Sequence, residues 1–207
     1  MRTDDRAWFR SLHYGFVDPN ATVCLWWEVL RDHRLHVHAE LRHQAKTIEA
    51  LATAIQRQTE AMRIDYVTYT VADQENIGKE DGDGETRPET FAKCGVPLRV
   101  IKPDPIQGWT RVRELLGLRP DGKPWLTIDP SCQYLIRALT SAMQDKSDSE
   151  DVMPFTNDQP LKALRVGAMS RPAPNLAKPP ELPKHAVGHL VNQLREGEKS
   201  SGMIHWR

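Results

Sequence analysis

Three strand-like segments stand near the start of the chain, and the connections between them are too short to hold a helix. The third segment alternates apolar residues with His36, His38 and Glu40, which is the pattern of an antiparallel strand with one solvated face. Strands joined by a few turn-forming residues pair as antiparallel neighbours, whereas parallel pairing needs a long crossover. The sequence therefore predicts a β-meander built from residues 9–17, 22–30 and 35–41.

Helical and strand-like segments then alternate up to residue 170. Apolar residues recur at helical spacing after Thr47, and β-branched and aromatic residues fill the run that ends at Asp73. We expect helices at 47–62, 88–95, 108–116, 132–143 and 158–169, strands at 64–73, 97–101 and 124–128, and a mobile acidic loop at 76–86. An antiparallel meander followed by αβ units gives an α/β fold, a mixed sheet flanked by helices. The ribonuclease-H-like fold has this layout.

Composition fits a single domain with an extended tail. Apolar residues make up 39% of the 207 residues and charged residues 27%, which is enough for one hydrophobic core. Proline residues gather after residue 170, a composition typical of an extended linker. We therefore predict one domain over residues 1–170, and a Pro-rich linker with a short C-terminal helix and tail over residues 171–207.

Charge and cysteine content limit the possible partners. The formal net charge is zero, so that any DNA binding needs a local basic patch or a bound metal ion. Cys24, Cys94 and Cys132 are widely spaced and odd in number, which favours reduced thiols in a cytoplasmic protein. No apolar run approaches the length of a membrane span, and we expect no membrane partner.

Asp73 is the first candidate functional residue. It ends a strand-like run and precedes a polar loop, the position where α/β sheets usually place their chemistry. The alternative is that Asp73 only begins a turn, as aspartate often does.

Several short segments, taken in their order along the chain, resemble segments of a known protein family. They include Tyr14-Gly15-Phe16-Val17-Asp18-Pro19, the segment 34–40 with its terminal Glu40, Ala72-Asp73, Gly108-Trp109-Thr110-Arg111-Val112-Arg113, and Ala163-Leu164-Arg165. In this order the chain resembles the C-terminal nuclease domain of bacteriophage terminase large subunits. The resemblance implies a metal-dependent endonuclease that cuts concatemeric double-stranded DNA during genome packaging in the host cytoplasm. It also implies, as partners, a terminase ATPase domain or small subunit and the portal.

The resemblance implies site residues as well. Asp73 and Asp158 stand at positions of the family's acidic cluster, which binds one or two Mg²⁺ or Mn²⁺ ions, and His13 is a possible third ligand. His13 and Lys162 occupy two positions where the family usually carries aspartate, and Gln159 occupies a position where it usually carries histidine. The acidic cluster is therefore degenerate. A second hypothesis follows, in which the domain keeps the fold and binds DNA or packaging partners without cutting.

Basic residues supply the candidate DNA contacts, which are Arg111, Arg113, Lys123 and Arg165. Side chains of this kind position a duplex through its phosphates without reading sequence. For Arg111 and Arg113 a solvated helix face is an equally good interpretation. A ribonuclease-H-like nuclease outside packaging, such as a resolvase relative, is a third and weaker hypothesis.

Two further patterns are interpreted without a functional role. The spacing Gly117-x4-Gly122-Lys123 resembles a phosphate loop, but Pro124 and a strand-like run follow where a hydroxyl residue and a helix are required. His33, His36 and His38 lie close in sequence, yet no cysteine or carboxylate nearby completes a metal-binding set, which favours surface histidines.

Overall fold

The structure is a computed structural model that describes residues 7–15, 21–44, 47–78, 84–119, 121–142 and 158–171. The strands are β1 (Ala7–His13), β2 (Thr22–Val29), β3 (Leu35–His43), β4 (Val67–Asp73), β5 (Leu98–Ile101) and β6 (Leu126–Ile128). The helices are α1 (Ile48–Ala61), α2 (Gln74–Ile77), α3 (Arg87–Lys93), α4 (Pro105–Leu116), α5 (Gln133–Ser141) and α6 (Gln159–Met169). Asp18, residues 79–83 of the predicted loop at 76–86 and the predicted linker and tail beyond Arg171 lie outside the described residues.

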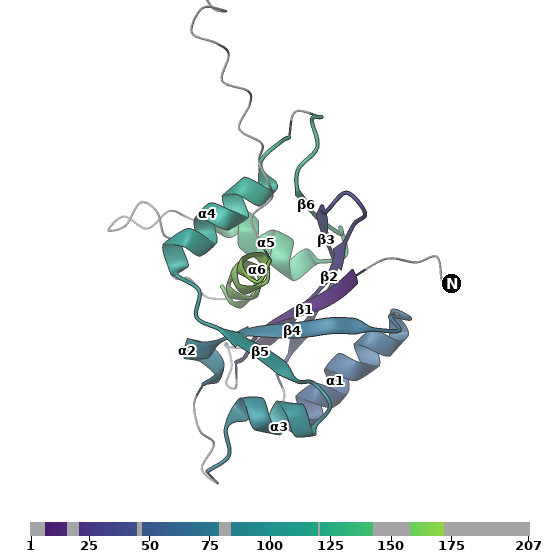
Figure 1. The fold of residues 1–207 in the computed structure, drawn as a ribbon, viewed down its shortest axis with the longest axis vertical. Helices are drawn as coiled ribbons and strands as arrows, with labels where there is room; N and C mark the ends of the chain where they lie inside the picture. Colours follow the sequence, from purple (N-terminus) through teal and green to yellow (C-terminus); the bar gives the residue numbers. More distant parts are fainter. Residues whose placement is uncertain are drawn as a thin grey trace, which may run out of the picture. The chain divides into compact units, whose positions relative to one another are not determined.

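A mixed sheet of six strands forms the centre of the domain, in the order β5-β4-β1-β2-β3-β6 (Figure 1). β1, β2 and β3 pair antiparallel in sequence order, which confirms the predicted meander. β4 lies parallel beside β1, β5 parallel beside β4, and β6 parallel beside β3. Since only β2 runs in the opposite direction, the carboxyl ends of β1 and β4 meet at one edge of the sheet.

Helices cover both faces of this sheet (Figure 1). α1 and α3 pack on one face, in a core that includes Trp26 and Phe91. α4, α5 and α6 pack on the other, in a core that includes Trp27 and Trp109. Adjacent residues of β2 point to opposite faces, so the Trp26-Trp27 pair fills both cores at once. Both indole rings are fully buried, which agrees with a packing role rather than a base-stacking role.

α6 lies against the centre of the sheet, where it contacts β1, β2 and β4. A glycine makes this close approach possible. A Cβ atom on Gly167 would lie 2.4 Å from Cζ2 of Trp27, which is inside van der Waals contact. The Trp27 indole is fixed in turn, because its Nε1 donates a 2.8 Å hydrogen bond to Ser11 Oγ. The last turn of α6 is thereby held against β1 and β2.

Two expectations about helix starts were wrong. A short helix, α2, follows Asp73 directly where we expected loop, because the Asp73 carboxylate accepts the backbone N–H of Glu75. α4 begins at Pro105 rather than at Gly108, with Asp104 as its cap.

Glu40 holds the start of α5. Its carboxylate oxygens accept the backbone N–H groups of Tyr134 and Leu135. That contact gives Glu40, at the end of the predicted meander, a structural role.

No helix within the described ranges is long and apolar enough to cross a membrane.

Candidate functional site

The carboxyl ends of β1 and β4 place His13 and Asp73 next to each other. Leu12 and Ala72 are register partners in the parallel pair, and His13 and Asp73 are the residues that follow them. Asp73 is 9% exposed and caps α2 through its 3.0 Å hydrogen bond to Glu75 N. This contact agrees with the plain interpretation of Asp73 as the start of a turn, and it leaves the second carboxylate oxygen for other partners.

A side-chain clamp fixes this corner of the sheet. Asn76 in α2 donates from Nδ2 to the carbonyl of Tyr14 at 2.6 Å and accepts the N–H of the same residue through Oδ1. Asn76 therefore satisfies both backbone groups of Tyr14 just past the end of β1. The segment that carries His13 and the segment that carries Asp73 are thus joined in one rigid unit.

α6 brings three charged residues to the same place. Asp158, Lys162 and Arg165 are spaced four and three residues apart, so they share one face of the helix. Lys162 Nζ lies 3.0 Å from Asp158 Oδ2, and Arg165 Nη2 lies 4.0 Å from Asp73 Oδ2. Asp158 occupies the N-cap position without a side-chain capping bond. Each of the two aspartates therefore faces a cation from the same helix.

Electrostatics at His13 follow from this arrangement. Burial lowers the pKa of His13 to about 3, and the positive charges of Lys162 and Arg165 act in the same direction. The imidazole is therefore neutral at physiological pH. Burial raises the pKa of Asp73, against the opposing effects of the Glu75 amide and of Arg165.

The Arg165 side chain passes close to α4. A Cβ atom on Gly108 would lie 2.4 Å from Cγ of Arg165, so the glycine makes room for the arginine stem. The guanidinium carbon lies 5.8 Å from the centre of the Trp109 ring. Its Nε is buried and lacks a hydrogen-bond partner among the described residues.

The other predicted DNA contacts are more dispersed. Arg111 is half-buried on α4, and its Nη1 lies 3.3 Å from Glu114 Oε2. Arg113 on the same helix is exposed, as is Lys123 in the turn before β6. A strand follows this turn, as expected for a segment that is not a phosphate loop. Of the four predicted residues, Arg165 is the one that pairs with a site carboxylate.

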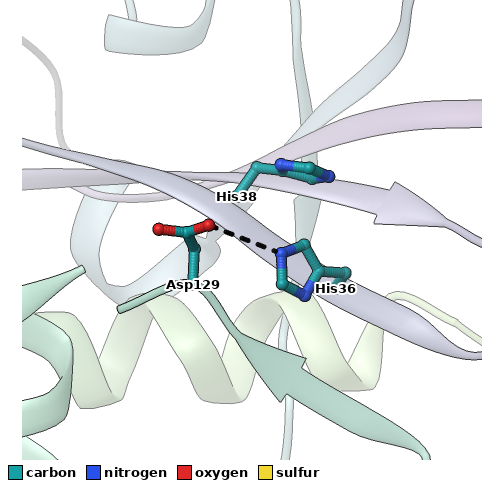
Figure 2. A group of neighbouring side chains, drawn as sticks. All are labelled: His36, His38 and Asp129. Atoms are coloured by element: carbon teal, nitrogen blue, oxygen red, sulfur yellow. Dashed lines mark ion pairs between the residues drawn. The ribbon is translucent and has the colours of Figure 1, made fainter. Parts of the chain in front are cut away.

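These residues do not fit a two-metal centre. Such a centre needs several carboxylates to balance two divalent ions, whereas here two aspartates face a lysine and an arginine. His13, Asp73 and Asp158 also do not form a group of donor atoms close enough to share an ion within the described ranges. Within these ranges, a group of donor atoms close enough to share one ion is formed by His36, His38 and Asp129 (Figure 2).

Sequence reasoning missed this second group. It found no cysteine or carboxylate that completes a metal-binding set with the histidines, and it expected surface histidines. Asp129 follows β6, a strand that pairs with β3 although about ninety residues separate the two in sequence, with Leu35 opposite Leu126. Only the pairing of β3 with β6 would have indicated this group, and no spacing pattern in the sequence predicts that pairing.

Comparison with solved structures finds proteins of the same fold as this domain. The large terminase of a thermophilic bacteriophage superimposes with a TM-score of 0.63 at 16% identity, over 79% of this chain and 39% of the terminase. The nuclease domain of the large terminase from bacteriophage SPP1, solved with bound Mn, superimposes with a TM-score of 0.51 at 12% identity, over 80% and 87% of the two chains.

The fold is that of a terminase nuclease domain. The predicted ribonuclease-H-like architecture is confirmed by this likeness. The chain spans about two fifths of the length of the thermophilic phage terminase. No protein-family model matches the sequence, and no curated protein does.

Proposed function

We propose that this chain is a terminase-like DNA-packaging domain that binds double-stranded DNA and does not cut it through a two-metal mechanism. The observation that carries the proposal is the ion pair between Lys162 and Asp158, with Nζ and Oδ2 3.0 Å apart. Lys162 stands where the family resemblance places an aspartate. In this chain the Lys162 ammonium is paired with the Asp158 carboxylate, which a metal ion would need as a ligand.

The charge balance of the site supports this proposal. Asp73 and Asp158 contribute two negative charges, Lys162 and Arg165 contribute two positive charges, and His13 is neutral. A divalent ion that approached this group would meet no net attraction and would have to displace a paired ammonium. The same balance gives a phosphate no net attraction, so that phosphate contacts here would depend on charge-assisted hydrogen bonds from the ammonium and the guanidinium.

Basic residues, dispersed over the domain, supply the proposed contacts to DNA. We assign phosphate contacts to Arg165 and Lys162, and to the residues predicted from the sequence, Arg111, Arg113 and Lys123. Phosphate contacts of this kind give binding that is independent of sequence and weakens steeply with salt.

A metal-dependent endonuclease is the second candidate, with Asp73, Asp158 and His13 as ligands of Mg²⁺ or Mn²⁺. The observation that favours it is the position of His13 and Asp73 at adjacent strand ends. A neutral imidazole is also a competent ligand for a Mn²⁺-like ion. The fold shared with the Mn-bound SPP1 domain points in the same direction.

Either function implies the partners of a packaging machine. We propose that the chain acts with a terminase ATPase domain, a small subunit or a portal, in the cytoplasm of the host cell.

One experiment separates the candidates. The purified chain is incubated with plasmid DNA in Mn²⁺, in Mg²⁺ and in chelator, and its affinity for a labelled duplex is measured by fluorescence anisotropy. We expect salt-dependent binding and intact plasmid in all three buffers. Nicking that requires metal and disappears in Asp73→Ala would overturn the proposal in favour of the nuclease. A folded chain that neither binds nor cuts DNA would exclude both functions.

Restoring the missing carboxylates tests the physical reasoning. The double variant His13→Asp/Lys162→Asp should bind Mn²⁺ in a calorimetric titration, because it adds two carboxylates and removes the competing ammonium. The control is Lys123→Asp, which replaces a lysine by aspartate at an exposed residue outside the site. If the double variant binds Mn²⁺ no better than the control, the substitutions are not what prevents metal binding.

A further inference from the structure

The second group of possible metal ligands lies away from the candidate site. His36 stands near the start of β3, whereas His13 and Asp73 stand where β1 and β4 end, and β1, β3 and β4 all run in the same direction. Figure 2 shows the Asp129 carboxylate directed at the His36 ring, with His38 on the same strand. One donor atom from each of the three residues lies within 4.8 Å of the other two. Nothing in the proposed function uses this group.

The backbone fixes the three residues in place. Trp26 pairs with Ala39 and Trp27 with Val37, so His38 is the extra residue of a β-bulge in β3. Bulges of this kind change the direction in which a side chain points. Asp129 is held against the same strand, because its backbone N–H donates to the carbonyl of Val37 at 2.8 Å.

The histidine rings are oriented by oxygen partners, as in known metal sites. His36 Nδ1 lies 2.7 Å from Thr127 Oγ1, which leaves Nε2 toward Asp129 Oδ2 at 4.0 Å. His38 Nε2 contacts the carboxylate of Glu28, a residue of β2 whose side chain is 5% exposed. A metal-bound histidine almost always has its other ring nitrogen bonded to a carboxylate or another oxygen.

Charge at this group suits a divalent cation. Asp129 and Glu28 place two carboxylates beside the two imidazole rings. Unlike the aspartates of the candidate site, the three possible ligands show no lysine or arginine paired with them among the described contacts.

We propose that His36, His38 and Asp129 bind one divalent transition-metal ion of the zinc class, with Glu28 supplying the second negative charge. Imidazole nitrogen combined with carboxylate oxygen favours Zn²⁺, Co²⁺ or Ni²⁺ over Mg²⁺ and Ca²⁺, which prefer oxygen alone. Tetrahedral coordination with bonds of about 2.1 Å places ligand atoms roughly 3.4 Å apart. The 4.0 Å between His36 and Asp129 is therefore close to that required, and small side-chain rotations complete the approach.

The ion would connect the short edge strand β6 to the centre of the sheet. β6 has three residues and pairs only with β3 among the described strands. Asp129 follows β6, His36 and His38 lie in β3, and Glu28 lies in β2. An ion bound to His36, His38 and Asp129 stabilises the folded state, since ligands from β3 and from the residue after β6 are not assembled in the unfolded chain.

Zn²⁺ binding to the full chain tests the proposal. We expect saturable binding of one Zn²⁺ by calorimetry, a rise in melting temperature with Zn²⁺, and a Co²⁺ absorption spectrum of a site with nitrogen ligands. Asp129→Asn should weaken Zn²⁺ binding at least tenfold, since it removes the charge at nearly constant size. His36→Asn should do the same.

The control is His33→Asn, an exposed histidine in the turn before β3 that lies outside the group. It should bind Zn²⁺ like the original chain. A folded Asp129→Asn protein that binds Zn²⁺ as tightly as the control would overturn the proposal and place any binding on the other histidines of the chain. Absence of Zn²⁺ binding to the original chain would overturn it as well.

Discussion

Acid sensitivity caused by His13 is the most direct test of the electrostatics at the candidate site. Burial and two cations lower the pKa of His13 to about 3, from an ordinary value of 6.5. In the unfolded chain the same imidazole titrates near its ordinary value. Between these two pH values the unfolded chain binds a proton that the native state does not bind. The free energy of unfolding must therefore fall as the pH is lowered from about 6.5 toward 3.

The magnitude follows from the size of the shift. Each pH unit within the window costs about 1.4 kcal/mol, so that lowering the pH from 8 to 5 removes about 2 kcal/mol of stability through His13 alone. Asp73 acts in the opposite direction. Its carboxyl pKa is raised in the native state, so the native state takes up a proton more readily than the unfolded chain and becomes more stable as the pH falls. The effect of His13 is therefore isolated by comparing two proteins that both contain Asp73.

The assay is urea unfolding at pH 8 and at pH 5, followed by tryptophan fluorescence. The variant His13→Asn removes the titrating imidazole at this position. Its free energy of unfolding should therefore fall by about 2 kcal/mol less than that of the original chain over this interval. His33→Asn is the control, because it removes an exposed histidine and should lose as much as the original chain. Equal losses in the original chain and in His13→Asn would refute the reasoning, since His13 would then titrate normally beside Lys162 and Arg165.

Three further predictions concern packing and caps. Gly167→Ala should lower the free energy of unfolding by about 1–3 kcal/mol, measured by urea unfolding, because its Cβ would lie 2.4 Å from the rigid Trp27 ring. Glu40→Gln should cost about 1–2 kcal/mol in the same assay, since it weakens charge-assisted hydrogen bonds to the first turn of α5; an unchanged midpoint would contradict this role. Gly108→Ala should cost little stability, because the group that it meets is the flexible Arg165 stem, yet it should weaken duplex DNA binding by anisotropy; unchanged binding would remove Arg165 from the interface.

The sequence predicted most of the secondary structure because its local signals agree. The alternation of His36 and His38 with apolar residues predicted β3, and the β-branched run up to Asp73 predicted β4. α2 was missed because its start depends on a single capping contact by the Asp73 carboxylate. A helix of four residues has no periodicity to detect.

The candidate site was predicted only in part. The position of Asp73 at a strand end and the position of Asp158 before a helix could be predicted from local pattern. The contact between Lys162 and Asp158 joins residues four apart at one end of α6, so it depends on the helix alone. Local pattern could not predict that this face of α6 meets the strand end that carries Asp73, because that depends on how α6 packs on the sheet. The close approach of Gly167 to Trp27 allows that packing, in which Arg165 Nη2 lies 4.0 Å from Asp73 Oδ2.

By itself the sequence determined the order and type of the elements, since hydrophobic period and turn chemistry are local properties. Only the tertiary structure decided which charges meet. The contact of Arg165 with Asp73 and the approach of Asp129 to His36 join residues more than ninety positions apart. Electrostatic interactions depend on distance in space and on burial, and both are set by the pairing of β6 with β3 and by the packing of α6 on β1 and β4.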